Sequence, residues 1–438
     1  MPDHAISSDP AVQAQLDRLS SLSPGADTLG LDRIGRLLSR LGDPHLSMPP
    51  VFHVAGTNGK GSTCAFLRAA IEATGKAAHV YSSPHLVRFN ERIRVAGQLV
   101  DDTTLAALLS EVLDHAEGID ASFFEVTTAA AFLAFARTPA AATIVEVGLG
   151  GRLDATNLVQ PAVCGVAALG YDHQQFLGNR LIDIAAEKAG IAKSGVPLVT
   201  MDYPVAVRAR VAAVAEAAGA PVFARGLAWS SETARTTVRY LDPGFTVVTR
   251  RPRLVGAHQS RNLALALAML RHQGAVNVPE AAMRAAADWA TWPARMQRLG
   301  DGPLTAMLPA GSELWLDGAH NPSAAAPVAR ALRTIARGRP VTLVLGMLAN
   351  KDARDVLRLL APMTERVIAV PVPGHEHYRP LALARLAEQL GTPAETAADV
   401  PAALASLSRV TSGPAVALVA GSLYLAGAVL AGNDELPD

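Results

Sequence analysis

The sequence predicts an α/β fold of two domains, each built on a mostly parallel sheet. Short apolar runs alternate with longer stretches in which apolar residues recur at helical spacing. Runs that are apolar on both faces and separated by helices are typical of a parallel sheet covered on two sides. The chain has 438 residues, half of them hydrophobic. That length exceeds one ordinary core, and that composition excludes a disordered chain.

The first domain is expected to contain five buried strands separated by helices. Helical spacing is clearest at residues 61–75 and 127–137. Residues 230–256 alternate in the manner of strands, which predicts a hairpin at the edge of this domain. The expected buried strands are residues 51–56, 77–83, 142–148, 163–169 and 197–200.

A second α/β unit follows, because the same pattern of apolar runs and helices returns near the C-terminus. Proline, glycine and polar residues concentrate at 291–303, as expected of a linker. We therefore expect domains at 1–295 and 296–438. The strands expected in the second domain are residues 314–317, 340–346, 366–372 and 415–421.

Charge and cysteine content exclude several classes of protein. Thirty-nine basic residues balance thirty-nine acidic ones, so no global field draws the chain to nucleic acid or to an anionic membrane. Two cysteines cannot form a disulfide framework. The N-terminus has no signal-peptide pattern. The uncharged stretch 415–432 is predicted to be a strand, a turn and a helix rather than a membrane span. A cytoplasmic protein that binds neither nucleic acid nor membrane is expected.

The stretch "HVAGTNGKGS", residues 53–62, joins an expected strand to an expected helix. Glycines let consecutive backbone N–H groups approach an anion, and the helix N-terminus adds partial positive charge. Lys60 would supply a full charge and Ser62 a hydroxyl. The extra Gly61 departs from the usual spacing, and a glycine-rich turn with an incidental lysine is the alternative. The context favours a loop that binds nucleotide phosphates.

Three polar side chains follow neighbouring strands, where ligands bind in doubly wound sheets. Ser83 lies in a Ser-Ser-Pro turn, Glu146 ends an otherwise uncharged strand, and His173 follows the next strand. A serine hydroxyl and a buried carboxylate are suitable Mg²⁺ ligands. A turn serine, a buried ion pair and a hydrogen-bonded histidine are the respective alternatives. Lys188 is equally ambiguous, because a helix lysine is usually solvated.

Eight short motifs follow one another between residue 56 and about residue 427. They are "GTNGKGS", "YSSPHLVRFNERI", "EVGLGGRLDATN", "DHQQFLG", "EKAGI", "WPARMQ", "LDGAHNP" and "GSLYLAG". In this order they resemble the folylpolyglutamate synthase/dihydrofolate synthase family of the Mur ligase superfamily. In that family the glycine loop has the sequence "GTNGKGS", which accounts for Gly61.

The resemblance implies a phosphate-loop ATPase domain at 1–295 and a smaller Rossmann-like domain at 296–438 that binds glutamate, with the catalytic cleft between them. The implied activity is an ATP-dependent ligase that proceeds through an acyl phosphate. It would add L-glutamate to dihydropteroate, to reduced folates, or to both. The residues implied for the nucleotide are Asn58, Gly59, Lys60, Gly61, Ser62, Asn262, Arg295 and Asp317.

The resemblance also implies Mg²⁺, held by Ser83, Glu146 and His173, with K⁺ as a further candidate cation. Lys188 would be carbamylated, which turns an ammonium into an anionic oxygen ligand. Lys60, His173 and Lys188 would be catalytic, and a monomer is expected. The residues implied for the folate-type substrate and the incoming glutamate are Ser122, Phe123, Phe124, Glu125, Leu153, Asp154 and Ala155, and His320 and Ser422, respectively.

At two places the sequence differs from the pattern of this family, and two other classes of protein remain as alternatives. Tyr171 replaces an expected small aliphatic residue, and "FFEVTT" at 123–128 differs near the implied pterin pocket. Another Mur-type amino-acid ligase would lack "SPHLVRFNERI" and "GLGGRLDATN". A phosphate-loop switch protein would hydrolyse ATP only to change shape.

Overall fold

The computed structural model describes residues 5–22, 29–410 and 413–438. The chain divides into two compact units, here called the N-terminal unit (residues 1–253 and 259–291) and the C-terminal unit (residues 254–258 and 292–438). The main division falls between Thr291 and Trp292, within the segment expected to be a linker. A domain limit at residue 295 stays a prediction.

An eight-stranded sheet forms the centre of the N-terminal unit. Its strands are β1 (Val51–Ala55), β2 (Ala78–Tyr81), β3 (Ile93–Val95), β4 (Gln98–Leu99), β5 (Ala142–Glu146), β6 (Pro161–Val166), β7 (Leu198–Thr200) and β8 (Val222–Ala224). Their order is β4-β3-β2-β5-β1-β6-β7-β8, with parallel pairing from β2 to β8. The mostly parallel sheet is thus confirmed. The short strands β3 and β4 pair antiparallel, which the apolar runs did not indicate.

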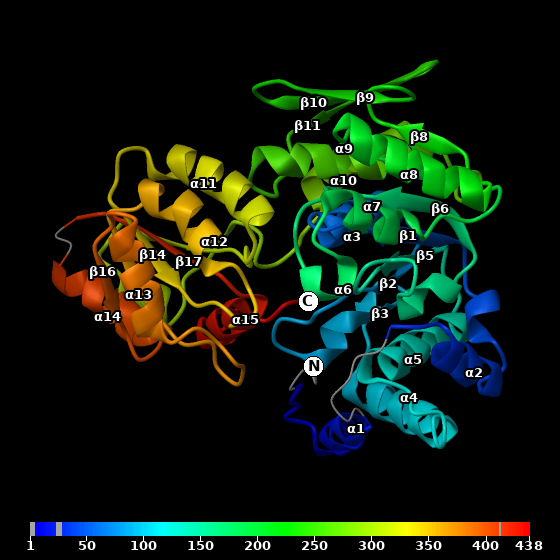
Figure 1. Cartoon of the computed structure of the whole chain (residues 1–438), viewed down its shortest axis with the longest axis horizontal. Helices are drawn as coiled ribbons and strands as arrows, with labels where there is room; N and C mark the ends of the chain where they lie inside the picture. The colour runs from blue at the N-terminus through cyan, green and yellow to red at the C-terminus, as the bar shows by residue number, and fades with distance from the viewer. Residues whose placement is uncertain (1–4, 23–28, 411–412) are drawn as a thin grey trace. The chain divides into compact units, whose positions relative to one another are not determined.

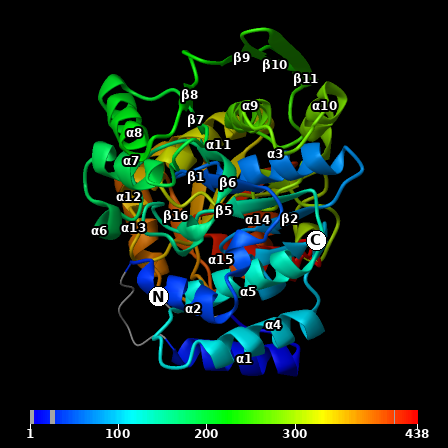
Figure 2. The same cartoon turned by 90° about the vertical axis from the view of Figure 1, so that its right-hand side faces the viewer.

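Helices cover both faces of this sheet, as the two-sided apolar strands predict. Figure 2 shows α3 (Lys60–Glu72) on one side of β1 and β5, and α5 (Phe123–Arg137) with α4 (Asp102–His115) and α1 (Pro10–Ser21) on the other. The same arrangement is visible in Figure 1. The remaining helices are α2 (Asp32–Arg40), α6 (Gln174–Leu177), α7 (Leu181–Ala189), α8 (Val205–Ala218), α9 (Ala257–Arg271) and α10 (Glu280–Trp289).

The expected hairpin is present as β10 (Thr237–Asp242) and β11 (Phe245–Arg250), and it lies in a sheet separate from the main one. A third strand, β9 (Ser230–Thr233), joins it in a separate antiparallel sheet. The inner face of this sheet buries Tyr240, whose ring stacks on Trp229. The sheet forms its own layer because its buried face packs on helices: α10 contacts β11, and Arg271 of α9 lies over the Phe245 ring.

The C-terminal unit contains a second sheet in the order β12-β13-β17-β14-β15-β16. All its pairs are parallel except β12 with β13. The four expected strands correspond to β13, β14, β15 and β17, whereas β12 and β16 are too short for a periodic signal. The bounds are β12 (Gln297–Arg298), β13 (Glu313–Leu316), β14 (Val341–Leu345), β15 (Arg366–Ala369), β16 (Ala394–Thr396), β17 (Val416–Ala420), α11 (Pro322–Ala336), α12 (Ala353–Leu360), α13 (Pro380–Gln389), α14 (Val400–Val410) and α15 (Leu423–Gly432).

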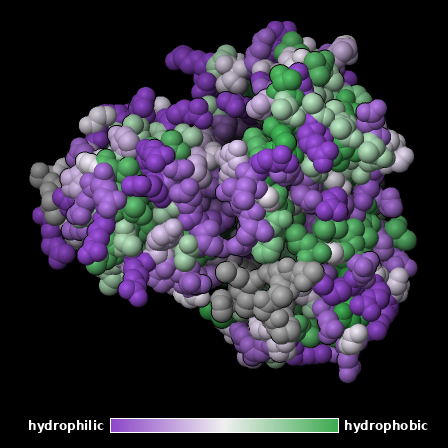
Figure 3. All heavy atoms as spheres, in the orientation of Figure 1, coloured by the Kyte–Doolittle hydropathy of each residue, from purple (hydrophilic) through white to green (hydrophobic). Residues whose placement is uncertain are grey.

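The uncharged stretch at 415–432 forms β17, a turn and α15, as predicted. Within residues 5–22, 29–410 and 413–438, every helix is too short or too polar to span a bilayer. On the face drawn in Figure 3, hydrophilic and hydrophobic atoms are interspersed over both units.

Candidate nucleotide and substrate site

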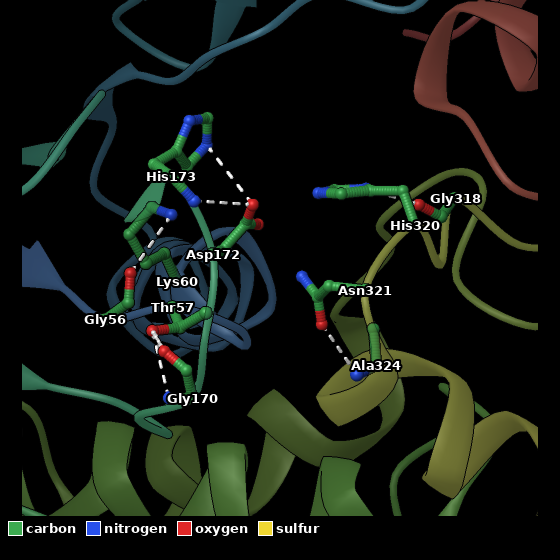
Figure 4. A network of polar contacts seen from close by, with 10 residues as sticks. All are labelled: Gly56, Thr57, Lys60, Gly170, Asp172, His173, Gly318, His320, Asn321 and Ala324. Atoms are coloured by element: carbon green, nitrogen blue, oxygen red, sulfur yellow. Dashed lines mark hydrogen bonds and ion pairs between the residues drawn. The ribbon is translucent and has the colours of Figure 1, made fainter. Parts of the chain in front are cut away.

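The glycine loop lies at the carboxyl end of the central strand β1 and leads directly into α3. The backbone N–H of Thr57 donates to the Ala168 carbonyl at 2.8 Å, and that of Asn58 does so at 3.2 Å. The Thr57 hydroxyl also faces both the carbonyl and the N–H of Gly170 (Figure 4). These bonds attach the loop to the segment that follows β6. The α3 N-terminus, with Gly61 and Ser62 buried in its first turn, is therefore held rigidly.

Asn262 of α9 lies against the glycine loop, although about 200 residues separate the two in sequence. Gly59 has φ +88°, and a Cβ added there would lie 2.5 Å from Asn262 Oδ1. Only glycine accommodates both the left-handed backbone and this close approach. The Asn262 amide donates to Gln259 Oε1 at 3.0 Å, which fixes the side chain. The structure thus brings Asn262 to the loop, as the sequence implied.

Lys60 is the first residue of α3, and its ammonium lies over the loop. Figure 4 shows it reaching back to the Gly56 carbonyl, to which it donates at 3.3 Å. The Lys60 Nζ is also 4.0 Å from Oε1 of Glu146, the last residue of β5. Glu146 is only 5% exposed. A buried carboxylate beside the glycine loop is thus present where a metal ligand was expected.

Lys188 of α7 is buried and faces the same group of charges. Burial, together with the positive charge of Lys60, lowers the pKa of Lys188 from 10.5 to about 7, and Asp172 and Asp154 oppose this shift. A large fraction of Lys188 is therefore the neutral amine near pH 7. A neutral amine is the form that reacts with CO₂ to give a carbamate.

His173 and Ser83 come from the loops after β6 and β2. His173 has φ +49° and a side chain 41% exposed, and its backbone N–H donates to Asp172 Oδ1 (Figure 4). Ser83 is partly buried and follows β2, the neighbour of β5. Loops after adjacent parallel strands meet at one sheet edge, so Ser83, Glu146 and His173 belong to the same edge.

The loop at 148–157 is held by buried polar contacts. Asp154 caps the short helix Ala155–Leu158 and accepts from the N–H of Leu149 at 2.7 Å. Burial raises the pKa of Asp154, and its hydrogen bonds oppose that rise. The Asn157 amide donates to the carbonyl of Gly190, next to α7. Leu153 is partly exposed while Ala155 is buried, so the two implied contacts differ in accessibility.

Residues 122–125 open α5 through a capping box. The Ser122 hydroxyl accepts from the Glu125 N–H, and the Glu125 carboxylate accepts from the Ser122 N–H at 2.7 Å. Arg33 of α2 donates to that same carboxylate at 3.0 Å. Phe123 is buried, and the Phe124 ring lies so close to Gly148 that a Cβ there would overlap it. This segment therefore adjoins the loop at 148–157.

In the C-terminal unit, Arg295 and Asp317 lie together. Ala294 and Met296, on either side of Arg295, both have left-handed backbones, with φ of 53° and 44°. Such strain is retained where surrounding contacts enforce it. Here the Asp317 carboxylate accepts from the Met296 N–H at 2.7 Å and from Ala319 at 2.8 Å. Burial raises the pKa of Asp317, and the neighbouring Arg295 opposes the rise.

His320 and Ser422 occupy loops at the carboxyl ends of β13 and β17, which are paired strands. The His320 ring contacts the Gly318 carbonyl at 2.8 Å through Nδ1, and Asn321 caps α11 by accepting from Ala324 (Figure 4). Ser422 caps α15 by accepting from the Tyr424 N–H at 3.2 Å. Both implied glutamate contacts thus lie at one edge of the C-terminal sheet.

Comparison with known proteins assigns the family. The family model for the Mur ligase, glutamate ligase domain matches residues 295–423. The dihydrofolate synthase/folylpolyglutamate synthase of Bacillus subtilis is 32% identical over 356 residues, which cover 77% of this chain and 80% of that protein. The chain belongs to the folylpolyglutamate synthase/dihydrofolate synthase family.

Solved structures of this family share the whole fold. Escherichia coli FolC in complex with DHPP and ADP superposes with a TM-score of 0.88 at 32% identity and 98% coverage of each chain. A bifunctional folylpolyglutamate synthase/dihydrofolate synthase with Mn, AMPPNP and L-glutamate bound has a TM-score of 0.85 at 30% identity, with 97% of this chain and 99% of that chain covered. The two-domain α/β prediction is therefore confirmed.

The donor set at the N-terminal sheet edge fits a divalent cation of the kind that this family binds. Glu146 supplies a buried carboxylate, Ser83 a hydroxyl and His173 an imidazole, which are ligands for Mg²⁺ or Mn²⁺. Among the described residues, no three His, Cys, Asp or Glu side chains form a metal cluster by themselves.

Two further residues contact the candidate site but were not among the predicted ones. Thr57 attaches the glycine loop to Gly170, and Asp172 faces Lys188. Thr57 stands inside the "GTNGKGS" motif and Asp172 opens "DHQQFLG", so both carried a signal. Their roles depend on pairing between β1 and β6, which the motifs do not specify.

Proposed function

We propose that this chain is an ATP-dependent ligase that adds L-glutamate to dihydropteroate, to reduced folates, or to both. The observation that carries the proposal is the approach of Lys60 to Glu146 at the end of the glycine loop. Lys60 would bind phosphate and Glu146 would bind the metal, so the two ligands would meet at this point. The segments at 122–125 and 148–157 also adjoin one another, because Phe124 lies against Gly148. A phosphate-loop switch protein would have no use for those substrate segments.

The chemistry needs ATP because a carboxylate anion is a poor electrophile. Transfer of the γ-phosphoryl group from ATP to the carboxylate gives ADP and an acyl phosphate. Attack by the amine of L-glutamate on the acyl carbon then forms the amide, with loss of phosphate and a proton. Phosphoryl transfer is chiefly positioning and electrostatics. The rigid loop that contains Asn58 would supply backbone donors at Gly59 and Gly61 for that purpose.

Lys60 would exchange its bond to the Gly56 carbonyl for the phosphate oxygens. Asn262 would border the nucleotide from its position against Gly59, and Arg295 and Asp317 of the C-terminal unit would complete nucleotide binding. Mg²⁺ held by Ser83, Glu146 and His173 would neutralise charge on the phosphates, and we leave K⁺ as a further candidate cation.

Lys188 would act as a carbamate. Its neutral amine would add to CO₂ and release a proton, which replaces a buried cation by an anion near the metal. The low pKa of Lys188 supports this assignment, because the reacting form is populated near pH 7. His173 would orient the phosphates or the metal from the loop after β6.

For the organic substrates, we propose that residues 122–125 and 153–155 bind the pterin end of the acceptor, and that His320 and Ser422 bind L-glutamate. The side chains of Asp154, Glu125 and Ser122 form hydrogen bonds within their own segments. They would therefore shape the substrate pocket. Phe124 and Leu153 are partly exposed and would offer apolar surface to the pterin. We also propose a monomer in the cytoplasm, where both cysteines would remain thiols.

Phosphate release from ATP tests the proposal. Release that requires both dihydropteroate and L-glutamate is the expected result. Equal release without either organic substrate would instead support a switch protein. A comparison of dihydropteroate with a reduced folate monoglutamate as acceptor then determines which activity is the main one.

A further inference from the structure

His53 in the middle of β1 is a buried histidine for which the reaction has no chemical use. Its side chain has no exposure, and its Nε2 lies 2.9 Å from the Thr156 hydroxyl. Thr156 in turn donates to Asp154 Oδ1. A chain of three side chains therefore connects the strand that carries the glycine loop to the loop at 148–157.

The donor and acceptor roles in this series of hydrogen bonds follow from the bond between Thr156 and Asp154. The Asp154 carboxylate also accepts from the backbone N–H groups of Leu149 and Thr156, at 2.7 and 3.1 Å. The Thr156 hydroxyl donates to Asp154 Oδ1. A hydroxyl has only one proton to donate, so Thr156 accepts from His53 and the His53 proton sits on Nε2. Burial lowers the pKa of His53 to about 3, so the ring is a neutral donor.

A second buried histidine shows that His53 is not merely a well-satisfied core residue. His79 of β2 uses both ring nitrogens, with the Thr138 carbonyl at 2.9 Å and the Ala96 N–H at 2.9 Å. The Nδ1 of His53 is buried without a hydrogen-bond partner among the described residues. Leaving a buried acceptor unsatisfied costs about 1–3 kcal/mol. An apolar residue would avoid that cost, so the bond to Thr156 has a benefit beyond filling space.

We propose that His53 is a positioning residue for the acceptor substrate. Through Thr156 it fixes Asp154 and thereby the loop at 148–157, which contains the substrate segment 153–155. This inference rests on the proposed function of that segment. Because His53 lies on β1, it fixes the position of the loop at 148–157 relative to the glycine loop that follows the same strand. A displacement of about 1 Å can cost up to a hundredfold in rate.

The test uses two variants at His53 and one at Thr156, the middle residue of the hydrogen-bonded series. His53→Leu keeps the volume but removes the donor, whereas His53→Gln retains an N–H near the position of Nε2. Thr156→Val removes the hydroxyl that joins His53 to Asp154. His79→Leu is the matched control for loss of a buried histidine. Thermal unfolding confirms that each variant is folded, and Thr156→Val carries the test should His53→Leu fail to fold.

In His53→Leu and Thr156→Val, we expect the KM for dihydropteroate to rise about tenfold and the KM for ATP to stay within about twofold. In His53→Gln, the KM for dihydropteroate should return most of the way to the wild-type value. The double variant His53→Leu/Thr156→Val should have a KM no higher than that of the poorer single variant, because both substitutions break the same series of hydrogen bonds. An unchanged KM, an equal rise in both KM values, or the same selective rise in His79→Leu would overturn the proposal.

Hydrogen exchange without substrate separates this inference from the proposed function. Peptides spanning 147–158 should exchange at least about tenfold faster in His53→Leu than in the wild type. Faster exchange supports the positioning chain even if the wild type shows no turnover with dihydropteroate, an outcome that would reject only the function. Unchanged exchange in both His53→Leu and Thr156→Val rejects the positioning chain whatever the substrate proves to be.

Discussion

The Lys60 ammonium lies 4.0 Å from the Glu146 carboxylate, at the meeting point of the loops after β1 and β5. Two oppositely charged groups, which we propose bind different ligands, thus lie side by side. Lys60 also holds the Gly56 carbonyl. When nucleotide binds, Lys60 would leave both Glu146 and the Gly56 carbonyl to contact phosphate. Glu146 would then contact a divalent cation.

Lys60→Ala should reduce ATP-dependent turnover by at least about a thousandfold, because it removes the mobile charge that stabilises phosphoryl transfer. Phosphate release with both organic substrates measures this effect. Circular dichroism and thermal unfolding should show an intact fold, since Lys60 is a helix N-terminal residue outside the apolar core. Turnover within tenfold of the wild type would contradict the role of Lys60.

Gly59→Ala should weaken nucleotide affinity by about tenfold or more, because the new methyl group would displace the Asn262 amide in addition to straining the backbone. Titration with ADP or a non-hydrolysable ATP analogue measures the affinity. Gly75→Ala is the matched control: its φ of +79° is similar, but nothing lies within 4 Å of its Cβ position. That control should lose only about 1 kcal/mol of stability. Similar affinities in the two variants would speak against the Asn262 contact.

Gly148→Ala should raise the KM for dihydropteroate while leaving nucleotide affinity within about twofold. The added methyl group would overlap the Phe124 ring and push it from its place beside the loop at 148–157. Steady-state kinetics with each substrate varied in turn would reveal the selectivity. Gly274→Ala, where the Cβ position is open, should behave as the wild type. A matching loss of ATP affinity in Gly148→Ala would indicate general damage instead.

Lys188→Met should stabilise the unmodified protein most at low pH. The folded-state pKa of Lys188 is about 7, below the 10.5 of an unfolded lysine. Between these values the unfolded state binds the extra proton, so the stability of the wild type rises with pH through this window. At pH 6, in CO₂-free buffer, the variant should therefore be more stable by roughly 3–5 kcal/mol. That advantage should shrink toward pH 10 in urea unfolding, and an advantage independent of pH would contradict the buried-amine assignment.

Lys188→Ala should lose most activity and recover part of it with a short carboxylic acid, because the acid can supply the missing anionic oxygen. Phosphate release with and without added acetate or formate measures the rescue. Lys193→Ala is a useful comparison, since that lysine is partly buried and donates to the Asn157 carbonyl. The acid should not rescue Lys193→Ala. Full activity of Lys188→Ala without any acid would exclude the carbamate.

The local pattern of apolar residues was sufficient to predict the positions of the longer strands. Apolar runs predicted β1, β5, β6, β14 and β17 to within a few residues, because buried parallel strands need no alternation and stand out from amphipathic helices. It was insufficient for β3, β4, β12 and β16, which have two or three residues each. Such strands exist only because a neighbour offers hydrogen bonds. The hairpin at 237–250 was visible, but its packing as a separate layer depended on α9 and α10.

The order of residues along the chain by itself determined the two α/β units, the glycine loop, and the identity of the polar groups at the strand ends. Tertiary structure decided which of those groups meet. Asn262 reaches Gly59, Lys60 approaches Glu146, and Lys188 loses its solvent and most of its affinity for a proton. These relationships arise from strand order and burial, which set distances and dielectric surroundings between residues far apart in sequence. No local pattern contains that information, because the electrostatics of a side chain depends on what the fold packs around it.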